Sequence, residues 1–210
     1  MTELLVPDVD DRGDLGTFVG RAVRLDPAAL VRLRATAGRV TAWATTPFDV
    51  LATRSVPGTL DPADVTAPAT ALLTALSVER AATVDPGTGG LWQGLLPPDD
   101  GWAVVDTVPS AELERLTERG LALAREHAGP LGPPASLLDQ TVLTVTEGGG
   151  PAVKIPLRCL FALSGMGFLV ASSDGEDEIV RVSATSSWLR LDARYGAVVR
   201  RRITALPLLV

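Results

Sequence analysis

Side chains able to act as nucleophiles or general bases are few in this chain. It has one histidine, His127, and one cysteine, Cys159, so any Ser-His-Asp or Cys-His site must use them. His127 lies two residues before Gly129 at the end of a predicted helix, where an imidazole can bond the last carbonyls. Cys159 lies in an apolar run, where a free thiol behaves as a small hydrophobe. The chain has no Gly-x-Ser-x-Gly motif either, so the sequence predicts no nucleophilic site.

Metal and phosphate motifs are also incomplete. Residues 8–13 begin like a calcium-binding loop, but Arg12 and Val19 stand where two of its main oxygen ligands should be. The glycine clusters at 87–90 and 148–150 have neither the lysine nor the spacing of a P-loop. We therefore expect no metal and no cofactor.

The most distinctive chemistry lies in a basic ribbon near the C-terminus. Two strands, 188–194 and 197–203, are predicted to join at a turn at Tyr195-Gly196, which places Arg190 opposite Arg201. Like charges across a ladder are unfavourable, so these groups need counter-charge. The candidate anion-binding residues are Arg190, Arg194, Arg200, Arg201 and Arg202.

Two sources of negative charge are possible for this ribbon. Acidic residues of the same chain are favoured, because residues 176–178 precede the adjoining strand and residues 1–16 form a solvated acidic arm. A phosphate or nucleic-acid backbone is the alternative, with Trp188 and Tyr195 available to stack on bases. Alternation along the strands puts some of the arginines on opposite faces, which favours internal pairing. The net charge of −6 also argues against wrapping of nucleic acid over a broad surface.

A long irregular segment, residues 83–101, carries another possible site. Loops of this length inside a compact domain often have a function. Its carboxylates Asp99 and Asp100 are candidates for a carboxylate-dependent enzyme. Trp92, Leu95 and Leu96 predict that the segment packs against the body of the protein.

The elements that must position these residues predict an α+β fold in a single domain, residues 1–210. We expect a mixed or antiparallel sheet with three to four helices, since 46% of the 210 residues are hydrophobic and 21% are charged. Helices are expected over 27–37, 67–81 and 110–128, and a buried apolar element over 157–169. Strands are expected over 21–25, 102–108, 141–146, 152–155 and 179–184, with hairpins over 39–56 and 188–203.

A weak internal match suggests a duplication. It predicts two β-α-β-β units, residues 20–56 and 151–203, joined by a helical middle segment, residues 57–140. Ala22–Leu33 aligns with Ala152–Leu163 with four identities in twelve positions. Chance agreement in a chain rich in Ala, Val and Leu is the alternative explanation.

Composition and targeting features predict a cytoplasmic protein. The N-terminus has no basic region followed by an apolar core, so it is not a signal peptide. The most apolar stretch, Cys159 to Ala171, is shorter than the roughly 20 residues that cross a bilayer. No membrane contact is expected. Of the 19 basic residues only Lys154 is a lysine, which is typical of a GC-rich genome.

Four stretches carry a resemblance to a known group of proteins. They are RAVRLDP (21–27), SLLDQ (136–140), RCLFALSGMGFL (158–169) and WLRLDARYGAVVRRR (188–202). Together they resemble conserved hypothetical proteins of high-GC actinobacteria. That resemblance implies no known activity, ligand or catalytic residue.

The sequence leaves three hypotheses about function. The leading one is a non-enzymatic protein-interaction or scaffolding protein, in one version a homodimer. The apolar tail at 206–210 would favour association if it is exposed, and the alternative is a final strand packed on the core. The second is a module that binds an anionic ligand or nucleic acid through the arginine ribbon. The third is the carboxylate-dependent enzyme with its site in the 83–101 loop.

Overall fold

Both halves of the chain contain helices and strands in the computed structural model, which describes residues 2–78, 81–129, 132–146, 152–169 and 178–202. The N-terminal half contains β1 (Glu3–Leu5), α1 (Val9–Leu25), β2 (Leu30–Thr36), β3 (Arg39–Thr45), β4 (Leu51–Pro57), β5 (Thr59–Asp61), β6 (Asp64–Pro68), α2 (Ala69–Val78) and β7 (Thr83–Val84). The C-terminal half contains β8 (Ala103–Pro109), α3 (Ser110–Glu126), α4 (Ala135–Leu138), β9 (Thr141–Val145), β10 (Val153–Pro156), α5 (Leu157–Gly165), β11 (Ile179–Ala184), β12 (Trp188–Ala193) and β13 (Gly196–Arg201).

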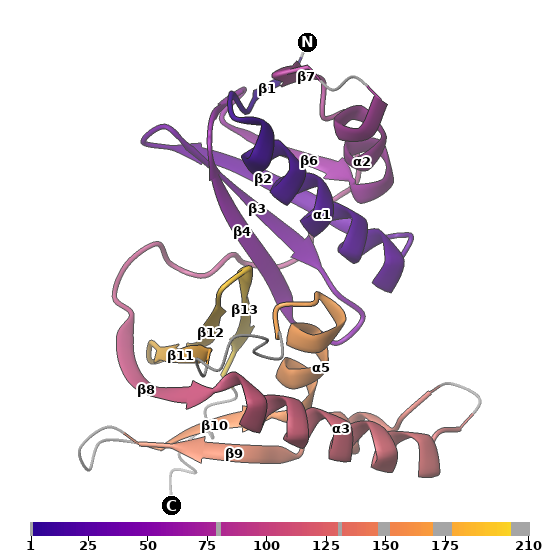
Figure 1. Ribbon diagram of the computed structural model, residues 1–210, viewed down its shortest axis with the longest axis vertical. Helices are drawn as coiled ribbons and strands as arrows, with labels where there is room; N and C mark the ends of the chain where they lie inside the picture. The colour runs from indigo at the N-terminus through magenta and orange to yellow at the C-terminus, as the bar shows by residue number, and fades with distance from the viewer. Residues whose placement is uncertain (1, 79–80, 130–131, 147–151, 170–177, 203–210) are drawn as a thin grey trace, which may run out of the picture.

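One antiparallel sheet of eight strands joins the two halves, in the order β6-β2-β3-β4-β13-β12-β11-β8 (Figure 1). The halves meet at the ladder between β4 and β13, where Ala52 pairs with Val198. Two smaller antiparallel sheets, β5-β1-β7 and β10-β9, lie near opposite ends of the long axis of the molecule. The backbone of the large sheet is therefore continuous across the middle of the chain.

The helices pack on one face of the large sheet because buried residues alternate along its strands. On β2, Val31 and Leu33 are fully buried and alternate with partly exposed arginines. The buried face meets Phe18 of α1, Leu72 of α2 and Leu160 of α5 in one core. Each such side chain contributes about 1.5–3 kcal/mol when it leaves water, so this layer carries most of the packing energy.

The connector, defined as residues 85–102, covers part of the opposite face of the sheet. Its Trp92 and Trp102 pack against Trp43 of β3 and Trp188 of β12, which lie on either side of the β4–β13 ladder. The expectation that the 83–101 segment packs on the body of the protein is confirmed for Trp92 and Leu96, whereas Leu95 is 68% exposed. Trp92 and Trp102 of the connector therefore contact both halves of the protein.

The order of elements at the start of the chain returns at its end. The series β1-α1-β2-β3-β4 matches β10-α5-β11-β12-β13, and the shorter series β6-α2-β7 and β8-α3-β9 lie between them, with α4 inside the second. The large sheet is also symmetrical about the β4–β13 ladder, since β3 and β12, β2 and β11, and β6 and β8 hold matching places. The alignment read from the sequence is wrong, because Ala22–Leu33 covers α1 and β2 whereas Ala152–Leu163 covers β10 and α5.

The N-terminal acidic segment differs from its prediction. Residues 1–16 were expected to form a solvated arm, but they contain β1 and the first half of α1. Asp8 caps this helix, because its carboxylate accepts hydrogen bonds from the backbone N–H groups of Asp10 and Asp11. Acidic residues in a first turn stabilise a helix through its dipole, and this accounts for the charge run.

The next two elements were assigned the wrong type. The strand expected at 21–25 is the end of α1, and the helix expected at 27–37 is β2. Asp26 closes α1 as its C-cap instead of opening a helix. Its carboxylate accepts from the N–H of Ala28, a turn geometry that Asp favours as much as an N-cap. The buried residues of β2 recur with period two, which short apolar windows do not distinguish from a helical stripe.

The coarse fold is as expected, α+β with antiparallel sheets, although the described residues form five helices rather than three to four. The hairpin predicted over 39–56 forms, and Thr45 faces Leu51 across it. The glycine cluster at 148–150 and the apolar tail at 206–210 lie outside the described residues.

Candidate functional site

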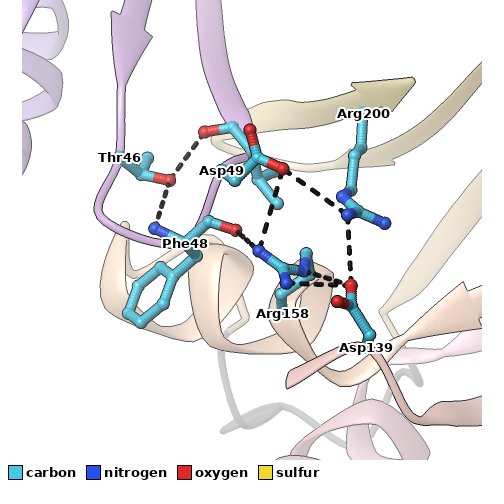
Figure 2. Close-up of polar contacts among 7 residues, drawn as sticks. Thr46, Phe48, Asp49, Asp139, Arg158 and Arg200 are labelled. Atoms are coloured by element: carbon cyan, nitrogen blue, oxygen red, sulfur yellow. Dashed lines mark hydrogen bonds and ion pairs between the residues drawn. The ribbon is translucent and has the colours of Figure 1, made fainter. Parts of the chain in front are cut away.

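The turn between β3 and β4 projects from the N-terminal half onto the C-terminal half. The hydroxyl of Thr46 closes the turn by donating to the carbonyl of Val50 over 2.6 Å. Asp49 adopts a positive φ of 55°, a left-handed conformation that Asp tolerates better than most residues. This geometry directs Phe48 and Asp49 at the start of α5 (Figure 2).

Arg158, in the first turn of α5, receives this turn. Its Nη1 donates to the carbonyl oxygen of Phe48 over 2.7 Å, and its Nε donates to Asp139 over 2.9 Å (Figure 2). The side chain is only 9% exposed, so its charge is buried together with partners from both halves. Breaking such a contact leaves a buried polar group without compensation.

Arg200, on β13, completes what we call the junction ion cluster: Asp49, Asp139, Arg158 and Arg200. Its Nη2 lies 3.1 Å from Asp139 and 3.5 Å from Asp49, and its side chain is 13% exposed. Two positive and two negative groups balance in the cluster. The Nε–H of Arg200 is buried and has no hydrogen-bond partner among the described residues.

A second link between the halves comes from the middle of β4. Arg54 donates from Nη1 to the carbonyl of Tyr195 over 2.5 Å and forms an ion pair with Asp14 of α1. This arginine therefore connects α1 to the β12–β13 turn.

A cavity of about 490 Å³, which we call the junction groove, opens beside the cluster on the β4–β13 join. Its walls come from the β3–β4 turn, from residues 92–95 of the connector and from residues 199–202. Two residues of its lining carry a buried N–H without a partner among the described residues: the Nε–H of Arg200 and the indole N–H of Trp92. Donors beside apolar walls suit a ligand with an apolar body and a carbonyl or carboxylate oxygen.

The arginine ribbon folds as a hairpin, but its register differs from the prediction. Arg190 pairs with Val199 and Arg201 with Trp188, because the two turn residues are Arg194 and Tyr195. The two arginines expected to face one another are therefore not cross-strand partners. The shift of two residues keeps both on the same face.

Each candidate anion-binding arginine has a partner within the chain. Arg190 bonds Asp192 over 2.7 Å and lies over the ring of Trp102. Arg194 pairs with Glu178 over 2.8 Å, as expected of the 176–178 segment. Arg200 belongs to the junction ion cluster, Arg201 lies over Trp188, and Arg202 donates to the carbonyl of Thr185. Binding of an external anion by these residues stays a prediction.

The other candidate residues do not meet in one place. Asp99 is 79% exposed and lies 3.9 Å from Arg34, and Asp100 is exposed nearby. Cys159 is buried, and burial raises the pKa of its thiol to about 12, whereas His127 is exposed at the end of α3. Within the described ranges, no three His, Cys, Asp or Glu side chains gather as a metal site would require. None of the helices in that part of the chain is long and apolar enough to cross a membrane.

Sequence reasoning missed the junction ion cluster. One signal was present: Arg158 stands inside an apolar run, and a charge in such a run predicts a buried, paired side chain. Its partners lie 19 and 109 positions away, and nothing local in the sequence identifies them.

The C-terminal half matches a family profile described as a domain of unknown function, DUF8185, over residues 97–205. The chain belongs to the DUF8185 family. A second profile, DUF8010, also a domain of unknown function, matches residues 1–93, so the boundary between the two falls in the connector. No curated protein matches the sequence.

Solved structures of bacterial sliding clamps share the fold of this DUF8185 protein. The β subunit of DNA polymerase III from Caulobacter crescentus is 18% identical with a TM-score of 0.57, and that from Pseudomonas aeruginosa is 12% identical with a TM-score of 0.58. A sliding clamp from Bartonella birtlesii bound to griselimycin is 15% identical with a TM-score of 0.52. Each match covers 99% of this chain and 66% of the clamp, so the chain spans about two thirds of their length.

This fold corrects the functions expected from the sequence. A scaffolding protein of unknown function, a binding module built on the arginine ribbon and an enzyme built on Asp99 and Asp100 were each inferred from one local segment. The likeness instead covers nearly the whole chain and is to DNA polymerase sliding clamps. The DUF8185 protein thus has a DNA-clamp-like fold.

Proposed function

We propose that this protein acts as a sliding-clamp-like protein, whose copies associate into a closed assembly held around DNA. The observation that carries the proposal is the eight-stranded sheet that passes through both halves, with the helices packed on one face, in a chain matched over 99% of its length by clamps. A shared fold does not by itself transfer a function, so the proposal depends on the tests below.

The charges of the helices support a protein that is held on DNA because its assembly closes around the DNA, rather than because it binds the phosphates tightly. The helices α1, α2, α3 and α5 carry seven acidic and seven basic residues between them. Tight binding to the phosphate backbone needs several uncompensated cations, which this balanced layer does not offer. Linear DNA should therefore bind weakly, and firm retention should require an assembly that surrounds the DNA.

Self-association is supported by strands at the ends of the sheets. Among the described residues, β8 pairs only with β11 and β9 only with β10, so each keeps one edge without a ladder partner. Open edges attract strands from other chains. Val104 on β8 and Ile179 on β11 are 48% and 59% exposed, so this end of the large sheet carries two exposed apolar side chains at separate positions of the β8–β11 ladder.

The junction groove is the place where a partner that works on the same DNA would dock. Its support is the pair of unpartnered donors, the Nε–H of Arg200 and the indole N–H of Trp92, beside apolar walls. A segment with apolar side chains and one carboxylate would satisfy both features.

We also propose that the chain arose by duplication. The support is the repeated element order and the symmetrical strand order of the large sheet, not the residue match read from the sequence. Superposition of β1–β4 on β10–β13, with their helices, tests it.

The clamp proposal is tested by assembly and by DNA topology. Sedimentation velocity over a wide concentration range should show one discrete oligomer above the monomer. The protein is then mixed with nicked circular DNA while dilute and concentrated afterwards, so that the assembly closes around the circle. After a step to high salt, gel filtration should recover protein with the circle. A matched sample, linearised after assembly, should lose it.

Two outcomes would overturn the proposal. A monomer at every concentration removes the assembly. Equal retention on circular and linear DNA, or none on either by a confirmed oligomer, removes the topological link to DNA.

A further inference from the structure

A second cavity, on the helix side of the junction, has no part in the proposed clamp. It measures about 530 Å³ and lies between α3, α5 and the β3–β4 turn. Its apolar lining includes Phe48, Leu121, Ala124, Ala128, Leu138 and Phe161. This volume is in the usual range for sites that enclose small molecules.

The cavity exists because α3 and α5 separate after a close crossing. At the crossing, a Cβ on Gly120 would lie 2.3 Å from Leu157, so the helices touch there. One turn further along α3, Ala124 offers only a methyl group to the space, as does Ala128 just beyond the end of the helix. Phe48 closes the far side, with its ring edge-on to Phe161 at 5.9 Å.

The cavity has few polar groups, and the charged side chain in its lining is positive. Thr117 is buried, but its hydroxyl donates to the carbonyl of Leu113 over 2.7 Å and needs no further partner. Arg125 lies at the rim in the last turn of α3, and no carboxylate is paired with it in the part of the chain that the structure describes. Leu121, at 37% exposed, marks the open side.

We propose that this cavity binds a small amphiphilic acid, a molecule with an apolar chain and one carboxylate. The chain fills the space between Ala124 and Phe161, and the carboxylate meets Arg125. Such a ligand contacts Phe48 from the N-terminal half and α3 and α5 from the C-terminal half. Because the carbonyl of Phe48 is also held by Arg158, the ligand stabilises the junction between the halves.

Decanoate and decanol are the probes, titrated calorimetrically into the full-length protein below the micelle concentration. Both should bind with one site per chain, and decanoate should bind more tightly. Arg125→Ala should weaken decanoate by about two- to fivefold, because an exposed ion pair contributes modestly, and should leave decanol unchanged. Arg119→Ala, an exposed arginine on the same helix outside the cavity, is the charge control.

Filling the cavity tests the apolar half of the proposal. Ala124→Leu should reduce the affinity for both probes at least tenfold. Since Ala124 is buried and this variant could be misfolded, Ala128→Trp at the exposed mouth provides the second test. The proposal is overturned if neither probe binds, if the filling variants leave binding unchanged, or if Arg125→Ala weakens both probes equally. None of these outcomes bears on assembly or DNA retention.

Discussion

Arg158 shows how one buried charge can hold two parts of a chain together. Its guanidinium bonds the Phe48 carbonyl of the N-terminal half and Asp139 of the C-terminal half at once. Replacing a buried charged network with apolar groups can be neutral for stability, but removing one member of it is not. The junction should therefore be sensitive to single substitutions in the cluster.

We expect Arg158→Ala to destabilise the protein by about 1.5–3 kcal/mol, because it removes hydrogen bonds from a charged group and leaves the Phe48 carbonyl without its partner. Urea denaturation followed by tryptophan fluorescence measures the change. Arg181→Ala, an exposed arginine on β11, is the control and should change stability by less than about 0.5 kcal/mol. Equal effects of the two variants would contradict the assignment of Arg158 to the junction.

Asp64 gives a pH dependence at the sheet edge. Its hydrogen bond from Arg32 lowers the pKa of the Asp64 carboxyl below its ordinary value of 3.8. The stabilisation is complete above that ordinary value and is lost as the pH falls through the lower folded pKa. Both side chains are more than a quarter exposed, so the pair contributes less than about 1 kcal/mol.

The stability difference between the protein and Asp64→Asn should accordingly be largest near neutral pH and shrink in acid. Urea denaturation at about pH 7 and about pH 3 measures it. Asp99→Asn, at a carboxylate 79% exposed, is the control, with little effect at either pH. A difference for Asp64→Asn that stays constant with pH would contradict the role given to Arg32.

At the scale of elements, the crossing of α3 and α5 decides the shape of the C-terminal half. Gly120 allows it, since a Cβ there would lie 2.3 Å from Leu157. We expect Gly120→Ala to destabilise by about 1–3 kcal/mol through overpacking, although alanine is the better helix former. Thermal unfolding followed by circular dichroism measures the change.

Gly13, which has free space around it, provides the matched control for the substitution of Gly120 at the crossing. At Gly13, on the exposed side of α1, an added Cβ meets no atom within 4 Å. Gly13→Ala should therefore stabilise by about 0.5–1 kcal/mol through helix propensity alone. If both substitutions stabilise the protein, the close approach of α3 and α5 is not as tight as described.

The elements that could be predicted from the sequence are those in which the hydrophobic periodicity and the residues of the caps and turns indicate the same structure. The helix at 110–126 has an amphipathic stripe and a clear end, and the 39–56 hairpin has Pro47 in its turn. The first 36 residues failed because α1 contains Gly13, Gly16 and Gly20, which read as a loop, whereas its N-cap at Asp8 stands in a run of acids. Propensity opposed the helix there, and packing against the sheet prevailed.

At the scale of the whole molecule, the single domain of residues 1–210 stays a prediction. The shared sheet, the tryptophans of the connector and the junction ion cluster all join the two halves. We therefore expect one unfolding transition, with tryptophan fluorescence and far-ultraviolet circular dichroism changing together on heating. Two separate transitions would mean that the halves fold as independent domains.

The arrangement of the halves and the site between them could not be read from the sequence. The large sheet depends on the β4–β13 ladder, whose partners Ala52 and Val198 lie far apart in the chain. Small apolar residues at such positions are common in any strand of this composition. The arginine ribbon could be found as a hairpin, but its counter-charges Asp49 and Asp139 come from other elements. Pairing at long range carries no local signature.

The symmetry of the large sheet constrains how any assembly of this chain opens. The series beginning at β6 and β8 stop after their second strands, β7 and β9, and β6 and β8 themselves are the two end strands of the large sheet. A ring of copies therefore has two unlike seams. The inner seam is the β4–β13 ladder within one chain, where the covalent connector links the two halves. The outer seam lies between two chains and has no covalent link. If copies of this chain close around DNA as proposed, we expect the DNA to enter at the outer seam.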